Sequence, residues 1–170
     1  MFQSKVIKEN GFIFEFKGHN GRPDVAKLFL PENQNIMNDK DYIADITVVD
    51  DWHDKMSLSF YVFERFRGFG CMTILFSKFC EYLFEKYPRI IIINDIDSEN
   101  NTSIGFHKSF GFEYLGFHSK HQYSMNRELF EKTQEMRDKK IQGYLDKHNK
   151  KSREIVFGDF ADIANNALEL

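Results

Sequence analysis

Two glycines stand one residue apart in Arg65-Phe66-Arg67-Gly68-Phe69-Gly70-Cys71-Met72, between a strand-like pattern and a helix-like pattern. Glycine lets a ligand approach the backbone closely, because it has no side chain. The first turn of a helix adds N–H groups without helical partners and the positive end of the helix dipole. The stretch therefore predicts a site for a phosphate group, with Arg65 or Arg67 adding a charge-assisted contact. The alternatives are that the glycine turn serves packing only and that the arginines are solvated surface residues.

A second group of polar side chains follows in Asn100-Asn101-Thr102-Ser103-Ile104-Gly105-Phe106-His107. If this stretch is helical, Asn100, Ser103 and His107 share one face, because residues three and four apart are neighbours on a helix. They come just after a buried-strand pattern, so they predict one wall of a ligand groove. The alternative is that the polar side chains cap the helix and that the histidine is a satisfied core residue.

The elements before the glycine loop read as an antiparallel meander. Asn10-Gly11 separates two alternating runs, which is a strong hairpin signal. The polar stretch 31–40 is expected to be a loop, and Asp50-Asp51-Trp52-His53-Asp54 a polar turn. The expected strands cover residues 5–8, 12–17, 25–30, 42–49 and 56–63.

The elements after the loop alternate between helices and strands. Pro88 ends the first helix, because proline cannot continue one and restricts the residue before it. Asn101 or Thr102 is the expected N-cap of the second helix, and Gly111 its left-handed C-cap. The expected helices cover residues 69–86, 102–109, 127–148 and 159–168, and the expected strands 90–93, 112–117, 122–126 and 154–157.

Composition narrows the class of protein. The 170 residues suit one domain with a phenylalanine-rich core. No apolar run approaches the roughly 20 residues that span a bilayer, and no secretion signal follows Met1. Cys71 and Cys80 fall in one expected helix and cannot pair, which favours a reducing compartment and a cytoplasmic protein. The net charge of −3 argues against general coating of nucleic acid.

Together the two motifs resemble a known family. Arg65-x-x-Gly68-x-Gly70 is similar to the Arg/Gln-x-x-Gly-x-Gly/Ala loop of the GNAT superfamily of acyl-CoA-dependent N-acyltransferases, and Asn100 through Gly111-Phe112 resembles that family's later signature. The resemblance spans residues 42–126. It implies an α+β or α/β fold with a mixed, mostly antiparallel central sheet flanked by helices. Residues 1–126 would form the acyltransferase domain, and residues 127–170 a helical extension packed on the domain or on a partner.

The resemblance also implies a donor site for acetyl-CoA. The pyrophosphate would lie on the amides of residues 66–72, the pantetheine arm would pair with the backbone of residues 60–62, and Asn100 and Ser103 would line its other side. The implied binding residues are Phe60, Tyr61, Val62, Arg65, Phe66, Arg67, Gly68, Phe69, Gly70, Cys71, Met72, Asn100, Ser103 and His107.

Two residues are candidates for proton transfer. His107 stands where the family usually has a tyrosine; it would protonate the leaving thiolate, or only orient the donor. In several members of the family that the sequence resembles, the general base is an acid at the start of the strand before the loop, and this resemblance implies Asp54, beside His53, as the base, with Glu64 as a less well placed alternative. The other interpretation is that Asp54 belongs only to a solvated hairpin turn. A metal site at His53 with its neighbouring aspartates is not expected, so no metal is predicted.

The predicted function is therefore transfer of an acetyl group from acetyl-CoA to a primary amine of a protein, peptide or small molecule. The family's two N-terminal helices are missing from the pattern, which predicts an open acceptor side, suited to a protein or peptide, unless the extension or a homodimer partner covers it. One alternative is a non-catalytic acyl-CoA-binding module. Another, less favoured, is nucleic-acid binding through Arg137, Lys139, Lys140, Lys147, Lys150, Lys151 and Arg153.

Overall fold

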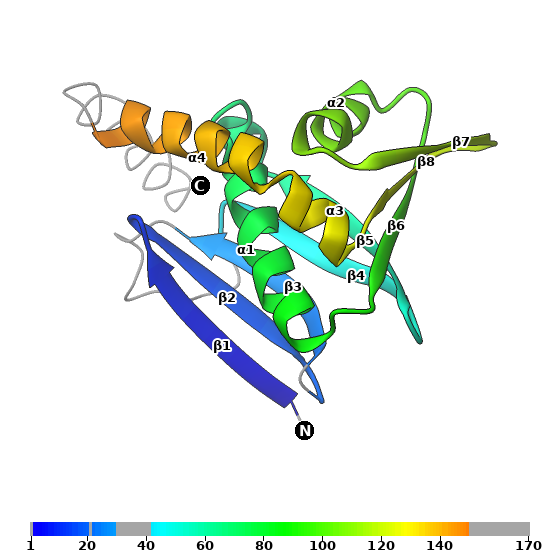
Figure 1. Cartoon of the computed structure of the whole chain (residues 1–170). Helices are drawn as coiled ribbons and strands as arrows, with labels where there is room; N and C mark the ends of the chain where they lie inside the picture. Colours follow the sequence, from blue (N-terminus) through cyan, green and yellow to red (C-terminus); the bar gives the residue numbers. More distant parts are fainter. Residues whose placement is uncertain (1, 21, 30–41, 150–170) are drawn as a thin grey trace.

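One mixed sheet forms the centre of the molecule (Figure 1). The computed structural model describes residues 2–20, 22–29 and 42–149. Within them the strands lie in the order β1-β2-β3-β4-β5-β6-β8-β7. The strands are β1 Phe2–Glu9, β2 Phe12–His19, β3 Arg22–Phe29, β4 Ala44–Trp52, β5 Lys55–Val62, β6 Ile91–Ile96, β7 Glu113–His118 and β8 Lys120–Met125. The helices are α1 Cys71–Lys86, α2 Asn101–Phe110, α3 Arg127–Lys132 and α4 Gln134–Asn149.

The first five strands are the expected antiparallel meander. Asn10 and Gly11 both have positive φ, as a tight hairpin turn requires. The chain then crosses over through α1 to β6, which is parallel to β5, and β8 and β7 continue the sheet in antiparallel pairs. A mixed, mostly antiparallel sheet with helices against it is thus confirmed.

The core lies between the sheet and α1, which packs against β2, β3, β4 and β5. Alternation in β2 turns Phe12, Phe14 and Phe16 toward this helix, where all three are buried. Phe76 of α1 is the centre of an aromatic cluster, with its ring 4.7 Å from that of Phe110 and 5.4 Å from that of Phe112. The phenylalanine-rich composition therefore builds the layer that holds α1 and α2 beside the sheet.

β5 and β6 pair only at their first residues. The register joins Lys55 to Ile91 and Met56 to Ile92, and the strands separate beyond those positions. Because the strands are parallel, both of their carboxyl ends face the start of α1 and the start of α2. The sheet therefore carries a gap at the edge where the two motifs meet.

The helical extension contacts the same core. Phe130 of α3 and Leu145 of α4 are buried among the core residues. Arg137 is only 2% exposed, and its guanidinium lies 3.6 Å from the centre of the Phe130 ring. This arginine is therefore packed against aromatic rings and does not belong to an exposed basic face.

Several expected boundaries differ from the structure. The expected helix 127–148 is broken at Thr133, whose hydroxyl donates to the carbonyl oxygen of Leu129. The first long helix begins at Cys71 instead of residue 69, because Gly68 and Gly70 have φ of +84° and +76°. The polar turn before β5 is shorter than expected, since β4 extends to Trp52. The expected elements 154–157 and 159–168, and the expected loop 31–40, lie outside the described residues.

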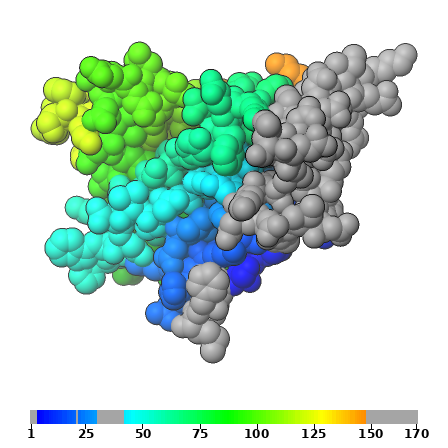
Figure 2. Space-filling view, turned by 180° about the vertical axis from the view of Figure 1, so that it is seen from behind, coloured from blue at the N-terminus to red at the C-terminus, as the bar shows by residue number. Residues whose placement is uncertain are grey.

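On the side of the molecule that Figure 2 shows, β4 and β5 reach the surface (cyan). The exposed side chains on these strands include Thr47, Val49 and Tyr61.

Among the described helices, none has the length and apolar character needed to cross a membrane.

Candidate functional site

The glycine loop delivers open backbone amides. After β5 the chain makes a short 3-10 turn at Glu64–Phe66, and Gly70 then becomes the N-cap of α1 in the left-handed region. No side chain caps this helix, and its first helical hydrogen bond runs from the amide of Ile74 to the carbonyl of Gly70. The amides of Cys71, Met72 and Thr73 therefore have no partner within the helix, which is the arrangement that binds phosphate.

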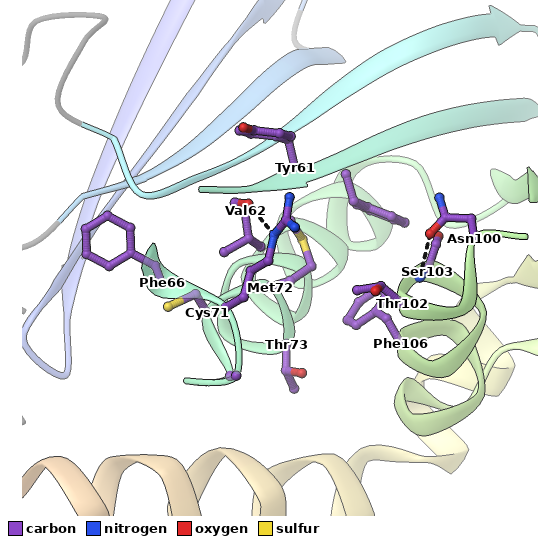
Figure 3. A pocket seen from close by; sticks show the side chains of 14 residues that line it. Tyr61, Val62, Phe66, Cys71, Met72, Thr73, Asn100, Thr102, Ser103 and Phe106 are labelled. Carbon is purple, nitrogen blue, oxygen red and sulfur yellow. Dashed lines mark hydrogen bonds between the residues drawn. The ribbon is translucent and has the colours of Figure 1, made fainter. Parts of the chain in front are cut away.

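A cavity of about 440 Å³ lies where the loop, β5 and α2 meet (Figure 3). In Figure 3, α2 faces the loop and α1 across an open space, with β5 along one side. The cavity is lined by Phe60, Tyr61, Val62, Phe66, Arg67, Gly68, Gly70, Cys71, Met72, Thr73, Asn100, Thr102, Ser103 and Phe106.

The cavity brings together most of the residues that the sequence marked for donor binding. Among the described residues, Arg65, Phe69 and His107 are the predicted ones that do not line it. Thr73, Thr102 and Phe106 line it and were missed, although each neighbours a residue of the two motifs. The helical spacing of Phe106 from Thr102 could have indicated that they share a face.

The backbone of β5 presents hydrogen-bonding groups to this gap. The amide of Leu58 points toward β6, where it donates to Oδ1 of Asn94 over 2.9 Å. Backbone groups alternate in direction along a strand, so those of Phe60, two residues on, point the same way. Phe60 lies beyond the last paired residues of β5 and β6, and it lines the cavity.

The two arginines of the loop differ in placement. Arg67 lines the cavity, and its Nε donates to the carbonyl oxygen of Val62 over 3.0 Å. That bond fixes the guanidinium beside the end of β5, with its remaining donors available to an anion. Arg65 is exposed outside the described lining of the cavity.

Asn100 is the N-cap of α2. Its Oδ1 accepts a hydrogen bond of 3.1 Å from the amide of Ser103, so the cap precedes the expected Asn101 or Thr102 by one or two residues. Gly111 ends the helix in the left-handed region, as predicted. The capping interpretation therefore holds for Asn100, which also lines the cavity beside Ser103.

His107 is fully buried, at 0% exposure. Its Nδ1 lies 2.6 Å from the carbonyl oxygen of Ser103, and its Nε2 lies 3.0 Å from Nδ2 of Asn94. Burial lowers the pKa of the imidazole to about 4, although the Ser103 carbonyl opposes this shift. The ring is therefore neutral near pH 7, and both of its nitrogens have protein partners.

Asp54 lies at the far end of β5 from the glycine loop. With Asp50, Trp52 and Ser57 it lines a second cavity of about 890 Å³, which Ile93 and Gln122 complete on the other side. These lining residues come from the end of β4, the β4–β5 turn and the neighbouring parts of β5, β6 and β8, where β5 and β6 are still close. Trp52 is 75% exposed at this cavity. Glu64, by contrast, lies in the 3-10 turn after β5.

Metal ligands and reactive thiols both need particular surroundings. Nowhere in residues 2–20, 22–29 and 42–149 do three or more His, Cys, Asp or Glu side chains gather as metal ligands do. Asp51, one of the aspartates beside His53, is instead paired with Arg22 over 2.7 Å. Burial raises the pKa of the Cys71 thiol to about 12, so this cysteine is not a ready nucleophile.

This chain is similar to known proteins in sequence pattern and in fold. The family model described as an acetyltransferase (GNAT) domain matches residues 35–133, which is more than half of the chain. By sequence, no curated protein is significantly similar to this chain.

Solved structures share the fold at low sequence identity. An acetyltransferase (GNAT family) from Bacillus anthracis has a TM-score of 0.51 at 12% identity, covering 62% of this chain and 68% of its own. Mutant forms of the spermidine/spermine N-acetyltransferase SpeG from Vibrio cholerae give 0.53 at 12% identity, covering 68% and 70%. The ribosomal-protein-S5-alanine acetyltransferase from Vibrio fischeri gives 0.50 at 10% identity, covering 60% of each chain.

Proposed function

The chain belongs to the GNAT family of acetyltransferases, and from this premise we propose that it transfers the acetyl group of acetyl-CoA to a primary amine of a protein or peptide. The observation that carries the proposal is the cavity between β5, the glycine loop and α2. One end of the cavity carries the open amides of a helix N-terminus, which suit a phosphate group. Along its side runs the part of β5 that is not paired with β6, which suits an arm that carries amide groups.

The donor would bind along this cavity. The amides of Cys71 to Thr73 and the guanidinium of Arg67 would hold the pyrophosphate, since each favourable interaction of an anion with a helix terminus is worth about 0.3–2 kcal/mol. The backbone of Phe60 would bond the pantetheine arm, and Ser103 would line its other side. The thioester would then lie toward the point where β5 and β6 come together.

The acceptor would approach from the open face of the sheet, through the second cavity. Its amine must be neutral to attack, and for a lysine-like amine of pKa 10.4 deprotonation at pH 7 costs roughly 4.6 kcal/mol. We propose Asp54, which lines this cavity, as the base that receives this proton through water. The neutral amine nitrogen bonds to the acetyl carbon, the carbon–sulfur bond breaks, and the sulfur leaves as the CoA thiolate. The second proton, which the nitrogen loses on becoming an amide, goes to the thiolate and gives the free thiol of CoA.

The openness of this second site supports a protein or peptide acceptor. Trp52 is 75% exposed at its rim, and the cavity is about 890 Å³. One structural neighbour is named as a spermidine/spermine N-acetyltransferase and another as a ribosomal-protein acetyltransferase. An acceptor screen should therefore contain small amines as well as proteins and peptides.

An acceptor-dependent assay of free thiol release from acetyl-CoA tests this function. We expect release with at least one peptide carrying a lysine or a free N-terminus, and a loss of turnover in Asp54→Asn without loss of CoA affinity. CoA binding without release from any amine would favour a non-catalytic acyl-CoA-binding module. Absence of CoA binding would contradict the proposal altogether.

A further inference from the structure

We propose that Asn94 and His107 are positioning residues, which hold β5 and β6 apart so that the backbone of β5 stays available to the donor. This inference rests on the proposed function, because it assumes that an acyl-CoA occupies the gap. Neither residue lines the cavity among the described residues, and they are 1% and 0% exposed. Asn94 and His107 can therefore affect the donor only indirectly, through the positions of β5, β6 and α2.

Asn94 stands in the sheet where β5 and β6 separate. The backbone pairing of β5 with β6 ends at Met56 and Ile92, and the next amide of β5 that points toward β6 is that of Leu58. In a regular parallel pair this amide would bond a backbone carbonyl of the neighbouring strand. Here it bonds the side-chain Oδ1 of Asn94 over 2.9 Å. A side-chain amide thus stands between the two strands at the point where they separate.

The side-chain amide of Asn94 is fixed by hydrogen bonds at both its oxygen and its nitrogen. Because its oxygen accepts from Leu58, its Nδ2 faces the ring of His107, 3.0 Å from Nε2. An amide nitrogen only donates, so Nε2 must be the unprotonated nitrogen of the ring. Nδ1 then carries the proton and donates it to the carbonyl oxygen of Ser103, 2.6 Å away. One tautomer satisfies every polar group in this chain of bonds.

Aromatic rings from several segments pack around the ring of His107. Its ring centre lies 4.5 Å from that of Phe112, 5.3 Å from that of Tyr123 and 5.4 Å from that of Phe60. These contacts come from β8, from β5 and from the segment after α2, so the ring is fixed on several sides. Burial also lowers the pKa of His107 to about 4, which keeps Nε2 unprotonated near neutral pH.

The result is a rigid link from α2 to β5. Ser103 and Phe106, which line the donor cavity, belong to the same helix as His107, while Phe60 follows Leu58 on β5. The bonds through Asn94 therefore set the distance between the two walls of the cavity. Loss of Asn94 would leave the buried amide of Leu58 without its partner. Loss of His107 would leave Nδ2 of Asn94 without its acceptor, so the Asn94 side chain would no longer be fixed and the strands could shift.

The experiment compares CoA affinity, steady-state kinetics and amide hydrogen exchange in the full chain. Asn94→Leu and His107→Phe remove the bonds while keeping similar side-chain volume. His107→Gln can still accept from Asn94 and donate to Ser103, so it is the rescue variant. Thr133→Val is the matched control, since it removes the bond that the Thr133 hydroxyl donates to the Leu129 carbonyl and the one that it accepts from Arg137, both away from the cavity.

We expect Asn94→Leu and His107→Phe each to weaken CoA binding by roughly tenfold, the scale of one lost hydrogen bond. The double variant should lose little more than either single variant, and the Leu58 amide should exchange faster in all three. kcat at saturating acetyl-CoA should change much less than KM. His107→Gln should recover most of the affinity, and Thr133→Val should keep it.

Other outcomes overturn the inference. Unchanged CoA affinity with faster Leu58 exchange would mean that the link is only structural. A collapse of kcat in His107→Phe with unchanged CoA affinity would mean that His107 takes part in the chemistry. If the unaltered protein does not bind CoA, the proposed function fails together with this inference. In the two outcomes above, by contrast, the unaltered protein still binds CoA and only the role of Asn94 and His107 is refuted.

Discussion

At the scale of single residues, environment decides what each polar side chain can do. His107 stands where the resemblance implies a proton donor, but the ring is buried, neutral and bonded at both nitrogens. The surroundings of Asn100 also give it a structural role, because its side chain caps α2 as well as lining the cavity. The sequence marked both residues, and only their surroundings distinguish support from direct contact.

The neutral state of His107 predicts a pH dependence of stability. The imidazole pKa is about 4 in the folded protein, below the unfolded value near 6.5, so the unfolded chain binds the proton first as pH falls. The free energy of unfolding should therefore decrease as pH falls from about 6.5 toward 4, by about 2–3 kcal/mol from this group alone. Urea unfolding at pH 7 and pH 4.5 measures it in the unaltered protein and in His107→Gln. Equal losses in the two proteins would contradict the assignment.

Arg67 gives a second test at this scale. Arg67→Ala should weaken CoA binding by roughly tenfold, because it removes a charge-assisted contact to phosphate, and the loss should shrink at high salt. Arg65→Ala should cost less, since Arg65 does not line the described cavity. Arg89→Ala, beyond the opposite end of α1, is the control for net charge. Calorimetric titration with CoA measures all three, and equal effects of the Arg67 and Arg89 substitutions would refute the role of Arg67.

At the scale of elements, the extension supports the glycine loop. A Cβ added to Gly70 would lie 2.4 Å from Cδ2 of Tyr144 on α4, so the ring packs directly on this glycine. Gly68 has a similar positive φ, but a Cβ there would meet no atom within 4 Å. Gly70 is thus required by backbone conformation and by packing, whereas Gly68 is required by conformation alone.

This difference between the glycines predicts a specific coupling. Gly70→Ala should lower the melting temperature more than Gly68→Ala, and part of its cost should disappear in a Tyr144→Ala background. Gly68→Ala should show no such relief. The melting temperatures of the three single variants, and of the two double variants that combine each glycine substitution with Tyr144→Ala, form two double-mutant cycles. Identical costs of the two glycine substitutions, or no coupling to Tyr144, would show that α4 does not bear on the loop.

At the scale of the whole molecule, local signals predicted most of the fold. The hairpin at Asn10-Gly11, the glycine loop and the C-cap at Gly111 each depend on neighbouring residues, and all three were confirmed. The break at Thr133 and the partner of His107 were missed. Asn94 lies just past the run 90–93 from which a strand was predicted, and its contact with His107 depends on how β6 and α2 pack. Such contacts between distant segments leave no periodic pattern in the sequence.

The two cavities also divide the molecule into two predicted binding sites. Trp52→Ala should raise the acceptor KM severalfold, because an exposed aromatic side chain contributes contact area at the second cavity. CoA affinity should stay the same, since the donor cavity does not include this residue. Steady-state kinetics with a peptide acceptor and CoA titration measure the two effects. A parallel loss of CoA affinity would mean that the two sites are not separate.

The most direct measurement is amide hydrogen exchange of the full chain with and without acetyl-CoA. We expect slower exchange at Phe60 and at residues 71–73, where the backbone of β5 and the first turn of α1 would hold the donor, with little change in β1 to β3. Unchanged exchange at these amides under saturating acetyl-CoA, or protection confined to another part of the chain, would contradict it.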